Sequence, residues 1–133
     1  MEQPAGNKIT GNPSSHPALS VKWVEDFPDI PLNRNEAYKL RVTSKGVEIE
    51  AITETGVYRA IQTLRQLTEK KGNGIAITGC EITDWPAFRI RGFMQDVGRT
   101  YISTDELKRE IAILARYKIN VFHWHLTENQ AWR

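Results

Sequence analysis

Residues 120–126 read Asn-Val-Phe-His-Trp-His-Leu, and they directly follow a helical pattern that starts near Ser103. Their length and their aromatic and β-branched side chains are typical of a strand. Ser103 and Glu106 have the spacing of a capping box, which predicts the first turn of the helix. Residues 89–97 form another strand pattern before this helix. A strand, a helix and a strand with short connections predict a βαβ unit with parallel strands.

The predicted strand at residues 120–126 has two unlike faces. Phe122, Trp124 and Leu126 share one face, which suits packing against a helix. His123 and His125 share the other face, so we expect both histidines to point to the inside of a sheet or barrel.

The first half of the chain has a different pattern. Residues 38–42 and 47–52 alternate between apolar and polar side chains across a glycine-bearing connection, which predicts a β-hairpin. A helical pattern follows, with Thr53 or Thr55 at its start and residues 70–72, Lys-Lys-Gly, at its end. We expect further strands at residues 19–24 and 74–82.

These patterns predict three segments. Residues 1–19 are rich in Gly, Asn, Pro and Ser and are expected to form a flexible tail. Residues 20–84 are expected to form an α+β domain with one helix on a mainly antiparallel sheet. Residues 85–133 are expected to form the βαβ unit, so the fold class of the whole chain is α/β.

The composition limits the classes of function. The chain has 133 residues and a formal net charge of +2, which is too small to indicate a nucleic-acid or membrane partner. No apolar run approaches the roughly 18 residues of a membrane helix. The N-terminus shows no signal peptide. Cys80 is the single cysteine, which excludes an internal disulfide.

Ligands of parallel α/β folds bind beyond the carboxyl ends of the strands. Here these ends carry Asp96 and Arg99 after the first strand, and His125 and Glu128 after the second. Arg99 can donate forked hydrogen bonds to hydroxyl groups or a carboxylate; alternatively, it forms a salt bridge with Asp96 or Glu128. Glu128 is a candidate acid, base or hydroxyl acceptor, or else a solvated loop carboxylate.

The two histidines allow two interpretations. His123 and His125 are alternate residues of one strand, so both imidazoles can reach one metal ion, as in metal-dependent barrel hydrolases. The alternative, which we favour, is a hydrogen-bonded pair without a metal.

Two sequence blocks resemble a known family. Residues 91–99 (Arg-Gly-Phe-Met-Gln-Asp-Val-Gly-Arg) and 120–133, together with the spacing between them, are similar to the start of the catalytic domain of glycoside hydrolase family 20, the β-N-acetylhexosaminidases. Residues 56–67 are similar to the helix of the α/β domain that precedes the catalytic barrel in this family. The resemblance extends over roughly residues 38 to 133.

The resemblance implies a (β/α)₈ barrel, no metal or other cofactor, and glycan substrates with a terminal N-acetylhexosamine. The acetamido oxygen of the sugar attacks the anomeric carbon in this family, an Asp positions that group, and the adjacent Glu is the general acid. Arg99 matches the arginine that binds sugar hydroxyls. Glu128 matches the first Asp of an Asp-Asp pair in a relay behind the general acid, and we place Asp96, His123 and His125 around it.

Two departures from the family pattern concern the relay. Glu128 is longer than Asp by one methylene, which moves its carboxylate by about 1.5 Å. Asn129 carries no charge, unlike the second Asp of the pair.

The length of the chain sets a further expectation. A complete barrel needs roughly 250 residues, far more than follow Trp85. We therefore expect a fragment with an inactive, truncated barrel, no catalytic residues of its own, and the Asp-Glu pair downstream. Its uncovered apolar strands predict self-association. The alternative functions are a non-catalytic α/β interaction module and the metal-dependent hydrolase described above. The resemblance implies an exported or lysosomal parent protein.

Overall fold

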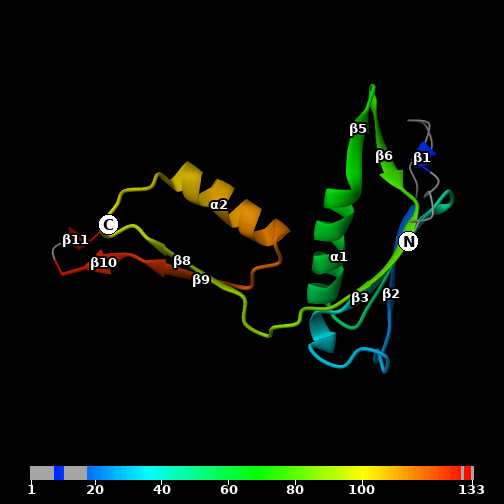
Figure 1. Cartoon of the computed structure of the whole chain (residues 1–133), viewed down its shortest axis with the longest axis horizontal. Coiled ribbons are helices and arrows are strands. Elements are labelled where there is room, and N and C mark those ends of the chain that lie inside the picture. Colours follow the sequence, from blue (N-terminus) through cyan, green and yellow to red (C-terminus); the bar gives the residue numbers. More distant parts are fainter. Residues whose placement is uncertain (1–7, 11–17, 130, 133) are drawn as a thin grey trace, which may run out of the picture. The chain divides into compact units, whose positions relative to one another are not determined.

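The computed structural model describes residues 8–10, 18–129 and 131–132, and the chain divides into two units, residues 1–87 and 88–133. The helices are η1 (Arg34–Glu36, a 3-10 helix), α1 (Glu54–Leu67) and α2 (Thr104–Arg116) (Figure 1). None of the helices in these described ranges is both long and apolar enough to span a bilayer. The strands are β1 (Lys8–Thr10), β2 (Ala18–Trp23), β3 (Tyr38–Thr43), β4 (Gly46–Ala51), β5 (Thr68–Lys71), β6 (Gly74–Thr78), β7 (Cys80–Asp84), β8 (Gly92–Asp96), β9 (Val121–His125), β10 (Thr127–Glu128) and β11 (Ala131–Trp132).

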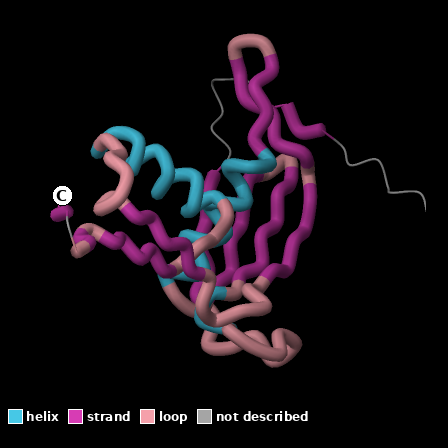
Figure 2. Tube along the Cα trace, turned by 60° about the vertical axis from the view of Figure 1, so that its left-hand side comes forward, coloured by secondary structure: helices cyan, strands magenta, loops and turns pink. Residues whose placement is uncertain are grey.

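The first unit contains a four-stranded sheet in the order β2-β4-β3-β7, whose strands run side by side in Figure 2. β3 pairs antiparallel with both β4 and β7. The predicted hairpin is therefore confirmed as β3 and β4, and the predicted strand near residue 19 is confirmed as β2. The expectation of one helix on a mainly antiparallel sheet is also confirmed.

Helix α1 covers one face of this sheet and forms the core with it. Tyr38, Leu40 and Ile49 are almost fully buried, and each such side chain contributes about 1.5–3 kcal/mol to folding through its burial. The side chains of the helix that pack on them follow its 3.6-residue period; they are Val57, Ile61, Leu64 and Leu67. Of the two capping candidates, Thr53 is the N-cap, and it accepts a hydrogen bond from the Gly56 N–H.

The predicted end of α1 was wrong. Lys70, Lys71 and Gly72 do not cap the helix, because it ends at Leu67 and Thr68 begins strand β5. Gly72 instead lies in the turn between β5 and β6, where its φ of 59° requires a left-handed backbone. Residues that looked like a helix terminus therefore form a β-hairpin, because β5 pairs with β6.

The strands at residues 74–82 belong to two different sheets. β6 lies in a three-stranded sheet of order β1-β6-β5, whereas β7 joins the four-stranded sheet. Within the predicted tail of residues 1–19, β1 and the start of β2 are described; residues 1–7 and 11–17 lie outside the described residues.

Strand β2 pairs with β4 in the parallel direction, unlike every other pair in the four-stranded sheet. Gly46 begins β4 with a φ of 146°, and a Cβ atom there would collide with the carbonyl oxygen of Ala18. Glycine is therefore required where β2 enters the sheet.

Two polar groups are buried beneath α1. Arg59 is 6% exposed, and its Nε and Nη2 atoms each lie 2.9 Å from Oε2 of Glu36 in η1. The Tyr38 hydroxyl donates to Asp84 Oδ2 (2.8 Å) and lies 2.6 Å from the hydroxyl oxygen of Thr63. These contacts connect α1 to η1, to the central strand β3 and to the edge strand β7.

Gly56 permits the close approach of α1 to the chain before β3. A Cβ atom at Gly56 would lie 2.5 Å from the Ala37 carbonyl oxygen and 3.1 Å from the Ala51 Cβ. Helix propensity favours alanine by about 1 kcal/mol, but overpacking of this kind costs typically 1–3 kcal/mol. We therefore expect Gly56→Ala to lower the free energy of unfolding, measured by urea denaturation.

Gly74→Ala is the matched control, because the nearest atom to its added Cβ is the Lys71 carbonyl oxygen at 3.8 Å. Its effect is expected to stay within about 0.5 kcal/mol. A Gly56→Ala protein as stable as the unsubstituted chain would contradict the proposed packing.

The second unit contains the βαβ arrangement. β8 and β9 pair in parallel, with Asp96 opposite His125, so the predicted parallel pair is confirmed. Helix α2 runs alongside these strands in both views (Figures 1 and 2). The rings of Phe93 and Phe122 stack with centroids 6.4 Å apart, whereas His123 and His125 alternate with Phe122 and belong to the opposite face of the sheet.

Side chains fix both ends of this unit. Asn120 accepts from the Arg91 N–H (2.9 Å) and donates to the Arg89 carbonyl (2.8 Å), so it joins the starts of β8 and β9. The capping box is confirmed, because the Ser103 N–H donates to Glu106 Oε2 (3.0 Å) and the Glu106 N–H donates to Ser103 Oγ (3.2 Å).

Candidate functional site

Four predicted site residues come together at the carboxyl ends of β8 and β9. Asp96 ends β8 and lies opposite His125, which ends β9. Arg99 follows in the loop to α2, and Glu128 ends the short strand β10. The parallel pairing positions these segments, because it brings both strand ends to the same edge of the sheet.

Asp96 organises the loop after β8. Its Oδ1 atom accepts hydrogen bonds from the backbone N–H groups of Gly98 (2.9 Å) and Arg99 (3.2 Å). Its Oδ2 atom accepts a hydrogen bond from Arg99 Nε at 2.5 Å. One carboxylate therefore fixes both the backbone and the side chain of Arg99.

The electrostatic environment keeps Asp96 ionised. Partial desolvation raises the pKa of its carboxyl group, but the hydrogen bonds from the Arg99 side chain and backbone, together with the nearby His125 ring, outweigh it and lower the pKa to about 2. A carboxyl group with a lowered pKa stabilises the folded protein at pH values above its unfolded pKa near 4, and this contribution is lost as the pH falls towards 2. The ion pair is therefore present throughout the neutral range.

His125 lies between the two carboxylates. Its Nδ1 atom is 3.4 Å from Asp96 Oδ1, and its Nε2 atom is 4.0 Å from Glu128 Oε2. The Nδ1 atom is buried and makes no hydrogen bond to any residue that the structure describes. Arg99 Nε is 3.8 Å from Glu128 Oε2, so the guanidinium also faces both carboxylates.

Gly98 allows the two loops to approach each other. A Cβ atom at this position would lie 3.3 Å from the backbone nitrogen and from the Cβ of Glu128. The sequence pattern predicted no role for Gly98 or Asn120. The signal for Gly98 was its position two residues after Asp96, which is typical of an Asx turn.

His123 lies apart from this cluster. Its ring centroid is 6.4 Å from that of His125, and the planes are nearly perpendicular. In the described part of the chain, the potential metal ligands whose atoms all lie within 4.8 Å of one another are Asp96, His125 and Glu128. The geometry does not favour a metal held by both histidines, and the Arg99 guanidinium already places a positive charge on Asp96.

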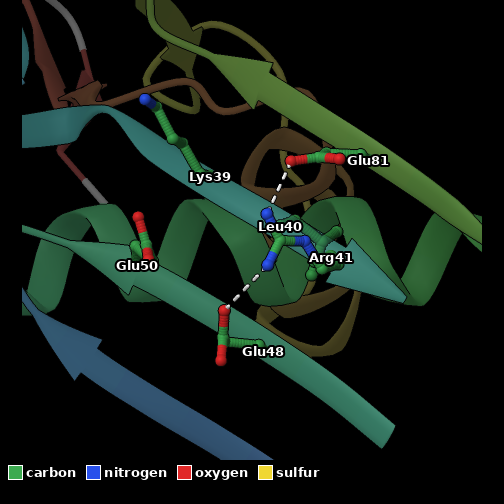
Figure 3. Close-up of a pocket in the computed structure, with 6 residues that line it drawn as sticks. All are labelled: Lys39, Leu40, Arg41, Glu48, Glu50 and Glu81. Atoms are coloured by element: carbon green, nitrogen blue, oxygen red, sulfur yellow. Dashed lines mark hydrogen bonds and ion pairs between the residues drawn. The ribbon is translucent and has the colours of Figure 1, made fainter. Parts of the chain in front are cut away.

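A second polar cluster lies on the face of the four-stranded sheet opposite α1 (Figure 3). Arg41 Nη2 lies 2.9 Å from Glu81 Oε1, and Arg41 Nη1 lies 3.6 Å from Glu48 Oε1. Lys22 Nζ lies 2.7 Å from Glu50 Oε1. These exposed charges pair across neighbouring strands, which is typical of a solvated sheet face.

Comparison with known families gives two matches in chain order. Residues 4–85 match the model of "Glycosyl hydrolase family 20, domain 2", and residues 88–133 match that of "Glycosyl hydrolase family 20, catalytic domain". The matched segments cover most of the chain and include every residue of the cluster around Asp96.

Similar proteins include a beta-hexosaminidase from Porphyromonas gingivalis. It is 43% identical over an alignment of 139 positions, which covers 99% of this chain and 16% of that protein. A beta-N-acetylhexosaminidase from Cellulomonas fimi is 41% identical over 87% of this chain and 23% of its own length. The chain thus spans less than a quarter of these curated relatives.

The similar solved structures include enzymes that act on N-acetylhexosamines, by their names. The beta-N-acetylhexosaminidase of Bacteroides fragilis superposes with a TM-score of 0.76 and 37% identity, over 86% of this chain and 22% of the other. The GH20 exo-beta-N-acetylglucosaminidase of Vibrio harveyi, solved in complex with N-acetylglucosamine, superposes with a TM-score of 0.72 and 37% identity, over 86% and 17% of the two chains.

Proposed function

Because this chain belongs to glycosyl hydrolase family 20, we propose that it supplies part of the sugar site of an enzyme that removes terminal N-acetylhexosamine residues from glycans. The observation that supports this most directly is the convergence of Arg99 and Glu128 at the ends of two neighbouring parallel strands, with Arg99 Nε 3.8 Å from Glu128 Oε2. This is the place where parallel α/β folds bind their ligands.

Arg99 is the residue that we expect to contact the sugar. Its side chain is 67% exposed, and a guanidinium donates hydrogen bonds in a fixed planar arrangement that suits adjacent hydroxyl groups. In this proposal Glu128 serves in the relay behind the general acid, with Asp96, His123 and His125 around it.

The bond-breaking step follows the substrate-assisted route of the family. The acetamido oxygen of the sugar attacks the anomeric carbon while a general acid protonates the leaving oxygen. We expect the Asp-Glu pair for these two tasks to lie outside the 133 residues, so the chain alone is expected to be inactive. No cofactor takes part in this proposal.

The test is hydrolysis by the product of the complete open reading frame that contains this sequence. We expect turnover of a chromogenic β-N-acetylglucosaminide or β-N-acetylgalactosaminide. The matching β-glucoside is the control, because it lacks the acetamido group and should remain intact. Equal turnover of the glucoside, or no turnover of either amino sugar, would contradict the proposal.

A further inference from the structure

Arg99 is held along one edge of its guanidinium. Its Nε atom donates to Asp96 Oδ2 and lies 3.8 Å from Glu128 Oε2. Neither terminal nitrogen has a hydrogen-bond partner among the residues that the structure describes, and the side chain is 67% exposed. The outer edge, with its Nη1 and Nη2 donors, is therefore open to a ligand.

Asp96 fixes this orientation through both of its oxygens. Oδ2 accepts the Nε–H of Arg99, while Oδ1 accepts the backbone N–H groups of Gly98 and Arg99. The Asp96 carboxylate thus holds both the backbone and the guanidinium of Arg99. This carboxylate lies 3.4 Å from His125 Nδ1 on the neighbouring strand. A long arginine side chain otherwise loses rotamer entropy when a ligand orders it.

We propose that Asp96 is a positioning residue that presents the open edge of Arg99 to two adjacent hydroxyl groups of the terminal sugar. This inference rests on the proposed function, because it assumes that Arg99 contacts the sugar. Asp96 acts through Arg99 and does not contact the substrate. Its contribution is preorganisation, which improves binding by removing the cost of ordering the arginine.

The experiment compares Asp96→Asn with Asp96→Ala in the product of the complete open reading frame. Asn keeps a carbonyl oxygen that can accept the two backbone N–H groups, but it loses the charge that attracts the guanidinium. Ala loses both functions. For Asp96→Asn we expect KM to rise about tenfold and kcat to change little, since one charge-assisted hydrogen bond is weakened and binding is affected uniformly.

Substrate analogues separate positioning from a general structural defect. Each analogue of the chromogenic glycoside lacks one ring hydroxyl. If Asp96 acts through Arg99, the analogue that lacks an Arg99-bound hydroxyl already binds weakly, and Asp96→Asn should raise its KM much less than that of the parent glycoside. Hydrogen exchange of the amides at residues 97–100 should be nearly unchanged in Asp96→Asn and faster in Asp96→Ala.

Asp105→Asn is the matched control, because Asp105 is an exposed carboxylate in the first turn of α2, 3.9 Å from Lys108. It should leave KM for every analogue unchanged. An unchanged KM for Asp96→Asn, or an equal rise for all analogues, would overturn the positioning role while the proposed function stands. Failure of the unsubstituted protein to hydrolyse any N-acetylhexosaminide would overturn both.

Discussion

Replacing Arg59 with methionine is expected to lower the free energy of unfolding by about 3–5 kcal/mol, the usual cost of removing one partner of a buried ion pair. Arg59 and Glu36 have side chains that are only 7% and 17% exposed, and two guanidinium nitrogens contact the same Glu36 oxygen at 2.9 Å. Without Arg59, the Glu36 carboxylate beneath α1 loses this compensating charge. The loss should appear as a lower midpoint in urea denaturation with an unchanged m-value.

Two further variants identify the cause of this loss. The double variant Arg59→Met with Glu36→Leu should regain most of the stability, because replacing both charges by apolar side chains is often nearly neutral. Arg41→Met removes an exposed arginine, 55% accessible and paired with Glu81, and should cost less than about 1 kcal/mol. If Arg59→Met and Arg41→Met lowered the free energy of unfolding by similar amounts, burial of the Arg59–Glu36 pair would not be the reason for the loss of stability.

Substitution of Arg99 by alanine should reduce kcat/KM for an N-acetylhexosaminide by about 100-fold or more in the product of the complete open reading frame. Two charge-assisted hydrogen bonds to sugar hydroxyls, each contributing roughly 1.5–3 kcal/mol, would be lost, and about 1.4 kcal/mol corresponds to a factor of ten. Arg99→Lys should recover only part of this loss, because an ammonium group cannot donate in the same planar, forked arrangement.

Arg109→Ala provides the control for the loss of an arginine from the same unit. Arg109 lies on α2, and its Nε donates to the carbonyl of Asp105 in the same helix, at 3.3 Å. We expect its kcat/KM to remain within about twofold of the unsubstituted protein, as for most surface substitutions away from a site. An Arg99→Ala enzyme with unchanged kcat/KM would contradict the assignment of Arg99 to the sugar site.

The elements that the sequence predicted well are those set by local pattern. The alternation at β3 and β4, the helical period of α1 and the capping box of α2 each depend on residues close together in the chain. The end of α1 was missed because two lysines and a glycine satisfy a helix terminus and a hairpin turn equally well. Only the pairing of β5 with β6, which depends on distant residues, decides between them.

The site was predictable in outline for a topological reason. Parallel strands place their carboxyl ends at one edge, so the sequence alone predicts that Arg99 and Glu128 lie close together. The hydrogen bonds of Asp96 and the role of Gly98 could not, because they depend on loop conformation and on how closely two loops approach. His123 was grouped with His125 by strand periodicity, yet the structure leaves it outside the group formed by Asp96, His125 and Glu128.

The parallel attachment of β2 has a consequence for folding on the ribosome. Lys22 of β2 pairs with Glu50 of β4, 28 residues later in the chain, so the earlier strand emerges from the ribosome before its partner does. At synthesis rates of roughly 5–20 residues per second, β2 waits on the order of seconds. During that interval Leu19, Val21 and Trp23, which remain substantially exposed even in the finished sheet, are available to chaperones that bind extended apolar segments of nascent chains.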